Sequence, residues 1–132
     1  MSVRLPRMAI LTLFHNPRCS KSRAALQLIQ KEVEKHEDLG NPIELEVVEY
    51  LKNPPTETQL RNIAEFMGGD KGVKAMLRPD APNAETVEDM IRLVQEDPSR
   101  LERPLAVDWN RGCAAIGRPP ENILKIVKGI TE

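Results

Sequence analysis

An apolar run that ends in a polar turn and leads at once into a helix-forming segment constrains the fold of this chain most strongly. The apolar run covers residues 8–14, and residues 24–29 are good helix formers. Pro17 fits the turn before a helix, and Cys19 stands where that helix begins. This order predicts a strand, a tight loop and a helix, with the cysteine at the helix N-terminus.

The position of Cys19 favours a reactive thiol. A helix N-terminus offers unpaired backbone N–H groups and the positive end of the helix dipole, and both favour thiolate over thiol. Potential positive charge within four positions is supplied by His15, Arg18, Lys21 and Arg23. We interpret Cys19 as a nucleophile in an anion-binding loop. The alternative is a buried, inert cysteine, which would normally stand inside an apolar run.

Size and composition favour one soluble domain over residues 1–132, with a flexible leader at 1–7. A net charge of −1 and four scattered aromatic residues argue against a nucleic-acid partner. No apolar run reaches membrane-spanning length, so no membrane association is expected. The chain has two cysteines, too few to indicate a framework of disulfide bonds. A reducing, cytoplasmic location is therefore predicted.

Apolar periodicity and helix breakers predict the remaining elements. The first helix is expected over 19–37 and the second strand over 43–50, while Thr56 and Gln59 form a capping box for the next helix. His36, in the charged end of the first helix, is expected at the surface. Further helical segments are predicted at 70–77 and around 87–94, short strands at 104–108 and 113–116, and a last helix from Pro119 that ends before Gly129.

A βαβ unit, several helices, a ββ hairpin and a final helix are the order of a thioredoxin-like α/β domain with a helical insertion and a mixed four-stranded sheet. In that topology the loop after the first strand meets the segment that enters the hairpin. Pro104 stands at this entry, so the Arg103–Pro104 peptide bond is a candidate for the cis form. A trans proline at the start of a strand is the alternative.

Three arginines stand beside prolines or in irregular segments, outside the helical stripes. They are Arg78, Arg103 and Arg118. Proline limits the local backbone, and the forked, permanently charged guanidinium is well suited to hold a tetrahedral oxyanion. The alternative, for any one of these arginines taken alone, is an ordinary surface residue without a role in binding.

The segment from His15 to Arg23 resembles the active-site loop of the glutaredoxin-linked arsenate reductase (ArsC) family, in the branch that reads Asn-Pro-Arg-Cys-Ser-Lys-Ser-Arg. The family's remaining signatures are similar to Leu77-Arg78, Glu102-Arg103-Pro104 and Gly117-Arg118-Pro119, which follow in order and at suitable spacing. The resemblance extends over residues 8–127.

This resemblance implies an enzyme in which the Cys19 thiolate attacks arsenate and the adduct is resolved by glutathione and glutaredoxin. His15 would help to stabilise the thiolate, and Pro104 would be the cis-proline. The oxyanion would be bound by Arg78, Arg103, Arg118 and Ser22. No metal and no bound cofactor are implied, and glutathione is the reducing co-substrate.

Two other functions stay open on the same residues. Ser22 stands where a Cys-X-X-Cys pair would have its second cysteine, so the loop cannot form an internal disulfide and depends on an external thiol. That suits arsenate reduction, and it equally suits a general glutathione-dependent thiol–disulfide oxidoreductase. A non-enzymatic regulator on the same fold is the third hypothesis. Cys113 is either a small core residue or a second redox thiol.

Overall fold

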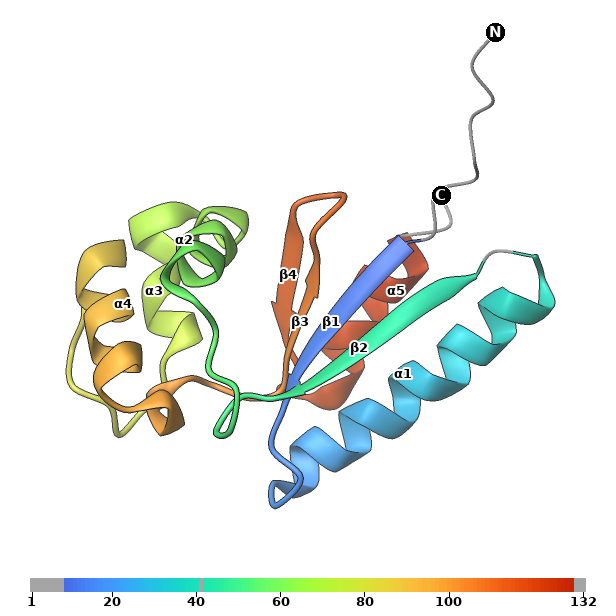
Figure 1. The fold of residues 1–132 in the computed structure, drawn as a ribbon, viewed down its shortest axis with the longest axis horizontal. Coiled ribbons are helices and arrows are strands. Elements are labelled where there is room, and N and C mark those ends of the chain that lie inside the picture. The colour runs from blue at the N-terminus through green and yellow to red at the C-terminus, as the bar shows by residue number, and fades with distance from the viewer. Residues whose placement is uncertain (1–8, 41, 130–132) are drawn as a thin grey trace, which may run out of the picture.

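The chain folds around a mixed four-stranded sheet, as the sequence predicts (Figure 1). The computed structural model describes residues 9–40 and 42–129, so the leader expected at 1–7 lies outside the described residues. The strand order is β2-β1-β3-β4, with β1 parallel to β2 and antiparallel to β3. The strands are β1 (Ala9–His15), β2 (Ile43–Glu49), β3 (Leu105–Asp108) and β4 (Cys113–Ile116). The helices are α1 (Ser20–Asp38), α2 (Glu57–Phe66), α3 (Val73–Met76), α4 (Val87–Glu96) and α5 (Leu124–Gly129).

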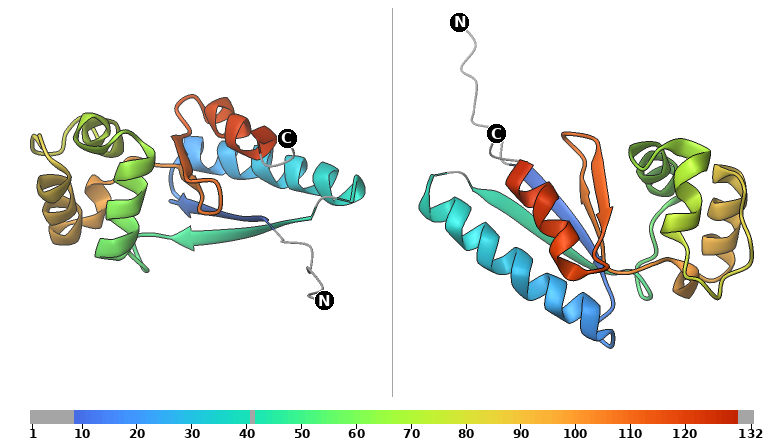
Figure 2. Two further views of the ribbon diagram at one scale, coloured as in Figure 1. Left: turned by 90° about the horizontal axis from the view of Figure 1, so that it is seen from above. Right: turned by 180° about the vertical axis from the view of Figure 1, so that it is seen from behind.

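Strand β1 is mostly apolar because both of its faces are covered. Leu11 and Leu13 point into a core shared with α1 and α5, which lie on one face of the sheet (Figure 2). Phe14 points the other way, into the core formed with α2, α3 and α4. A strand buried on both faces reads as a continuous apolar run rather than an alternating one.

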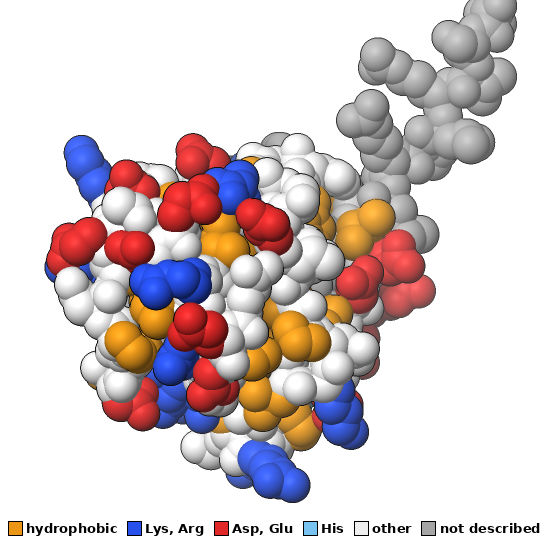
Figure 3. Space-filling model, turned by 60° about the vertical axis from the view of Figure 1, so that its left-hand side comes forward, with side chains coloured by type: hydrophobic (Ala, Val, Ile, Leu, Met, Phe, Trp, Pro, Cys, Tyr) orange, Lys and Arg blue, Asp and Glu red, His pale blue; other side chains and the backbone are white. Residues whose placement is uncertain are grey.

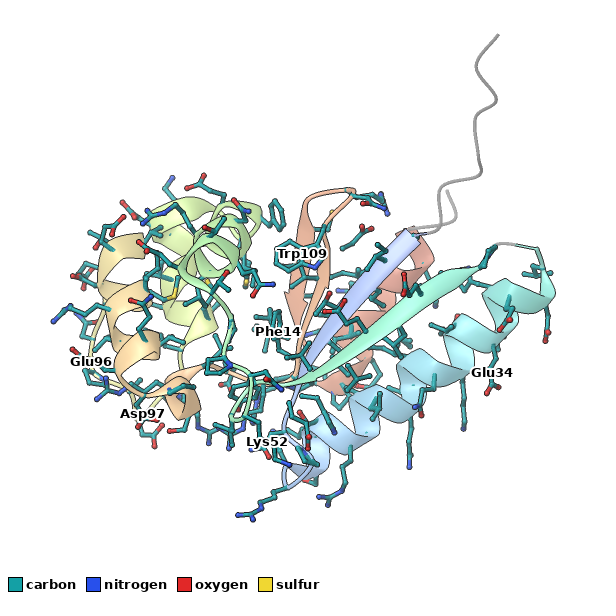
Figure 4. All side chains as sticks on the ribbon, viewed as in Figure 1. Phe14, Glu34, Lys52, Glu96, Asp97 and Trp109 are labelled. Atoms are coloured by element: carbon teal, nitrogen blue, oxygen red, sulfur yellow. The ribbon has the colours of Figure 1, made fainter. Side chains whose placement is uncertain are left out.

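The helices α2, α3 and α4 form a lobe beside the sheet. Trp109 connects the two parts, because its ring lies 6.1 Å from that of Phe66 and its Nε1 donates a 2.8 Å hydrogen bond to the hydroxyl of Thr12 (Figure 4). The predicted capping box of Thr56 and Gln59 is confirmed at the start of α2. Acidic and basic side chains are interspersed over the outer face of this lobe (Figure 3).

The segment that carries α4 begins and ends at nearly the same point of the lobe. Leu77 and Leu101 form an antiparallel β-bridge. The N–H of Arg78 donates to the carbonyl of Arg100 at 2.9 Å, and the N–H of Glu102 donates to that of Met76 at 2.8 Å. The bridge and these two hydrogen bonds therefore place the stretch before Arg78 and the stretch before Arg103 side by side.

Three expectations from the sequence are wrong in detail. Residues 70–77 are not one helical piece but a 3₁₀ turn, Gly69–Gly72, followed by the short α3, because Gly68 and Gly69 adopt φ values of 108° and 69°. The last helix opens with the 3₁₀ turn Pro120–Ile123 and includes Gly129. His36 is buried, because it follows Ile29 by seven residues and so shares the buried face of α1.

No helix within residues 9–40 and 42–129 is long and apolar enough to cross a membrane.

Candidate active site

The predicted site residues come together at one end of the sheet. β1 ends at His15 and β2 ends beside it, while β3 starts opposite Phe14, which pairs with Leu105. The Arg103–Pro104 peptide bond before β3 is cis. The N–H of Gly117 donates to the carbonyl of Pro104 at 2.8 Å, and this brings the segment after β4 to the same place.

The loop between β1 and α1 is held by hydrogen bonds of Asn16. Its carbonyl accepts from the N–H of Cys19 at 3.0 Å, and its side-chain Oδ1 accepts from the N–H of Arg18 at 3.0 Å. Its own N–H donates to the hydroxyl oxygen of the fully buried Ser22 at 3.2 Å. Ser22 therefore shapes the loop, and its predicted contact with an oxyanion stays a prediction.

Cys19 is the N-cap residue of α1 and is partly exposed. Partial burial alone would raise the pKa of its thiol. The backbone N–H groups of Ser22 and Lys21, together with the Arg103 guanidinium, outweigh burial, so that the pKa of Cys19 falls below its ordinary value. Arg118 Nη2 also lies 3.9 Å from Cys19 Sγ. The helix N-terminus and two arginines thus favour the thiolate.

Two of the three predicted arginines, Arg78 and Arg118, place their guanidinium groups beside one buried carboxylate, that of Glu102, and Arg103 contacts it through its backbone. Arg118 Nε lies 3.0 Å from Glu102 Oε1 and Arg78 Nη1 lies 3.5 Å from the same oxygen. The backbone N–H of Arg103 donates to that oxygen at 3.2 Å. Arg118 Nε also donates to the carbonyl of Arg103 at 3.0 Å. The structure therefore brings Arg78, Arg103 and Arg118 into one cluster.

Three polar atoms of this cluster are buried and lack a hydrogen-bond partner in the described part of the chain. They are the Tyr50 hydroxyl, Arg78 Nη1 and Arg103 Nε. Burial raises the pKa of Tyr50, while the nearby Arg103 and Arg78 cations oppose that rise. Buried polar groups in folded proteins are nearly always paired. The Tyr50 hydroxyl and Arg103 Nε therefore have unused hydrogen-bonding capacity near Cys19, whereas Arg78 Nη1 lies 3.5 Å from Glu102.

His15 is buried, and burial lowers its pKa, with Glu49 acting in the opposite direction. A lowered pKa favours the neutral imidazole at pH 7. Its predicted help to the thiolate therefore does not come from a permanent positive charge. The ring borders a cavity of about 270 Å³ that Arg18, Glu49 and Lys52 also line.

Cys113 is partly exposed at the start of β4, and its Sγ lies 3.7 Å from the carbonyl of Arg111. It lines a cavity of about 670 Å³ that also borders Arg118 and Lys125. Neither Cys113 nor Cys19 is in a disulfide. Among the residues that the structure describes, no group of three or more His, Cys, Asp and Glu side chains could hold a metal ion.

Sequence reasoning missed Glu102 and Tyr50 as parts of the site. A glutamate beside an arginine in the sequence reads as ordinary surface charge, and a tyrosine at the end of a strand reads as core. Only the fold shows that both side chains are buried next to the arginines. The Arg118–Pro119 bond is also cis, and nothing in the sequence analysis pointed to this second case.

The sheet, the free cysteine at the start of α1 and the cis-proline before β3 define the class of the molecule: a thioredoxin-like protein with one cysteine in its loop. The comparisons with known proteins agree with this class. The family model described as "Protein of unknown function (DUF1687)" matches residues 4–117.

Two relatives and one solved structure cover nearly the whole chain. "Arsenate reductase" of Neisseria meningitidis serogroup B is 38% identical over 125 residues, which cover 88% of this chain and 97% of that protein. "Uncharacterized protein YfgD" of Escherichia coli K12 is 34% identical over 123 residues, with 87% and 94% covered. The structure of "Arsenate reductase from Vibrio cholerae" superposes with a TM-score of 0.69 at 29% identity, covering 91% of this chain and 99% of that one. The chain belongs to the arsenate reductase family.

Proposed function

We propose that this protein reduces arsenate to arsenite through a covalent adduct on Cys19, with glutathione and glutaredoxin as the reductants. One observation carries the proposal: a thiol favoured as thiolate at a helix N-terminus lies 3.9 Å from an arginine that belongs to a partly buried three-arginine cluster. The names of the relatives support the same reaction, since several of them are called arsenate reductase.

In the first step the Cys19 thiolate attacks arsenic(V). A sulfur–arsenic bond forms, an arsenic–oxygen bond breaks, and the oxygen leaves with protons as water. Arg78, Arg103 and Arg118 hold the remaining oxyanion oxygens by charge-assisted hydrogen bonds. The N–H groups at the start of α1 keep the sulfur ionised until it attacks.

In the second step the sulfur of glutathione displaces another arsenic-bound oxygen, which leaves with protons as water. A glutaredoxin thiolate then attacks that glutathione sulfur, and the sulfur–arsenic bond breaks with its electron pair left on arsenic. The mixed disulfide that results has lost two electrons, and arsenic gains them as it passes from arsenic(V) to arsenic(III). Hydrolysis of the Cys19–arsenic bond releases arsenite and restores the thiol. No prosthetic group takes part, and the need for external thiols fits the reducing cytoplasm as the place of action.

A general thiol–disulfide oxidoreductase that acts on glutathione mixed disulfides is the second candidate. It is favoured by the observation that Cys19 has Ser22 in place of a second loop cysteine, because such an enzyme works with one nucleophile and external glutathione. The arginine beside the thiol favours arsenate, since the sulfurs of a mixed disulfide carry no charge and the carboxylates of glutathione lie several atoms away from them.

The test is turnover by the purified full chain with glutathione, glutaredoxin and glutathione reductase, followed through consumption of NADPH. Arsenate is the substrate in one arm and a glutathione mixed disulfide in the other. We expect turnover with arsenate and none with Cys19→Ser, because a hydroxyl is far less nucleophilic than a thiolate. Turnover with the mixed disulfide alone would refute arsenate reduction and support the second candidate.

The arginine assignment is tested with Arg118→Ala. Loss of one charge-assisted contact is worth roughly 1.5–3 kcal/mol, so kcat/KM for arsenate should fall about ten- to a hundredfold. Arg61→Ala is the matched control, because Arg61 pairs only with the exposed acids Glu57 and Glu88 on the helical lobe. Equal kcat/KM values for Arg118→Ala and the control would show that Arg118 is structural.

A further inference from the structure

The geometry points to Glu102 as the residue that positions the arginine cluster and sets its net charge, and thereby decides which oxyanions it binds. This inference rests on the oxyanion site of the proposed function. Glu102 is neither the nucleophile nor an anion ligand; it acts through the arginines that it holds.

The contacts of the Glu102 carboxylate converge on one oxygen. Oε1 lies 3.0 Å from Arg118 Nε and 3.5 Å from Arg78 Nη1, and it accepts the backbone N–H of Arg103 at 3.2 Å. These three partners come from three different segments of the chain. The Glu102 side chain is only 10% exposed, so water cannot replace these partners freely.

The backbone of Glu102 is fixed as firmly as its side chain. Its N–H donates to the carbonyl of Met76 at 2.8 Å, directly beside the bridge between Leu77 and Leu101. The cis peptide bond follows one residue later, between Arg103 and Pro104. A buried carboxylate held this way is stable only with its cations in place, so it fixes where Arg78 and Arg118 lie.

Glu102 also lowers the charge of the cluster. Three guanidinium groups carry three positive charges, and the buried Glu102 carboxylate cancels one of them. Asp80, 3.6 Å from Arg78 Nε, is exposed, so water screens its charge. Every negative charge of a bound anion is repelled by Glu102, so a dianion is repelled about twice as strongly as a monoanion. Glu102 therefore moderates the preference of the site for the more highly charged oxyanions, while Arg103 Nε, which has no hydrogen-bond partner among the described residues, keeps its capacity to donate.

The test compares two tetrahedral oxyanions of different charge, sulfate and perchlorate, by the protection that each gives Cys19 against iodoacetamide. Glu102→Gln keeps the shape and an acceptor oxygen but removes the charge. We expect the ratio of sulfate to perchlorate affinity to rise about three- to tenfold, as expected for one charge several ångströms away in a partly solvated site. If Glu102→Gln only loosened the structure and had no effect through charge, it would lower the affinities for both anions by the same factor.

Two further variants make the outcome specific. Glu96→Gln is the matched control, because it removes a carboxylate from an exposed 3.0 Å pair with Arg100, and its anion ratio should equal that of the wild type (Figure 4 labels Glu96). Glu102→Asp keeps the charge but shortens the side chain by one methylene. It should keep the wild-type anion ratio and lose arsenate kcat, and it carries the test if Glu102→Gln does not fold.

An unchanged anion ratio in folded Glu102→Gln, or a changed ratio in Glu102→Asp, overturns the role of Glu102. If neither anion protects Cys19 in the wild type, the oxyanion site itself is absent and both proposals are refuted. If both anions protect Cys19 but arsenate is not turned over, only the proposed function is refuted, and the anion ratios still decide the role of Glu102.

Discussion

Replacing Tyr50 with phenylalanine removes one hydroxyl group from the buried end of the arginine cluster and leaves the ring in place. Tyr50 is 0% exposed, and its hydroxyl has no hydrogen-bond partner among the described residues. The substitution therefore creates almost no cavity, and the polar interactions that it removes are those with the Arg103 and Arg78 side chains. We expect Tyr50→Phe to raise the free energy of unfolding.

The magnitude follows from the cost of burying an unpaired polar group, which is about 1–3 kcal/mol. The neighbouring Arg103 and Arg78 cations offset part of this cost, because they attract the phenol oxygen. A net gain of about 0.5–1 kcal/mol remains. For a chain of this length that gain corresponds to a rise in Tm of roughly 2–5 °C.

The pH dependence gives a second readout with a definite sign. Burial raises the pKa of Tyr50 above its unfolded value of about 10, so the folded state favours the protonated phenol. Ionisation of Tyr50 leaves the free energy of unfolding of the wild type unchanged below pH 10 and lowers it as the pH rises above 10. Tyr50→Phe lacks this group, so its free energy of unfolding does not fall for this reason. The stability advantage of the variant should therefore grow above pH 10.

Urea unfolding of both proteins at pH 7 and pH 10.5 measures these differences, with equal m-values as the check that the unfolded states are comparable. Thr12→Val is a control of opposite expectation, because the Thr12 hydroxyl accepts a 2.8 Å hydrogen bond from Trp109. Destabilisation of Tyr50→Phe by 1 kcal/mol or more at pH 7 would show that the hydroxyl is hydrogen-bonded, and the reasoning would be refuted.

Three further outcomes are expected. The rate of Cys19 alkylation should reach half of its maximum below pH 8.5, because the helix N–H groups and Arg103 lower the pKa of the thiol, and a midpoint at or above 8.5 would contradict this. Cys113→Ser should retain glutathione-dependent arsenate turnover, since the proposed resolving thiols are external; loss of turnover in a folded variant, with a Cys19–Cys113 disulfide found by mass spectrometry, would show a self-resolving enzyme. Thr56→Ala should lower the free energy of unfolding by about 1 kcal/mol, because the hydroxyl caps α2 at Gln59, and thermal unfolding of the two proteins measures it.

The strand, loop and first helix could be predicted because local chemistry determines them. The apolar run before Pro17 and the helix formers after Cys19 suffice to place the thiol at the start of α1. The capping box at Thr56 is equally local. The proline-flanked arginines could be nominated from the sequence, but their convergence depends on the meeting of β1, β3 and the segment after β4.

The parts that escaped prediction depend on contacts between distant segments. Glu102 is buried only because the stretch that precedes it pairs with Met76 and Leu77, some 25 residues earlier. His36 lies in a charged segment, and its burial follows from the packing of the end of α1, which charge patterning does not show. The 3₁₀ turn at Gly69–Gly72 likewise follows from positive φ values that a run of polar residues does not indicate.

The bridge between Leu77 and Leu101 turns the intervening segment into a loop whose two ends are already joined. The chain between them, α4 included, therefore starts and ends at one place in the fold. Closing such a loop costs little more when it is lengthened, because the entropy grows only with the logarithm of its length. The exposed turns of this segment can thus be lengthened or shortened while Arg78 and Glu102, which directly follow the two bridged leucines, keep their contact with each other.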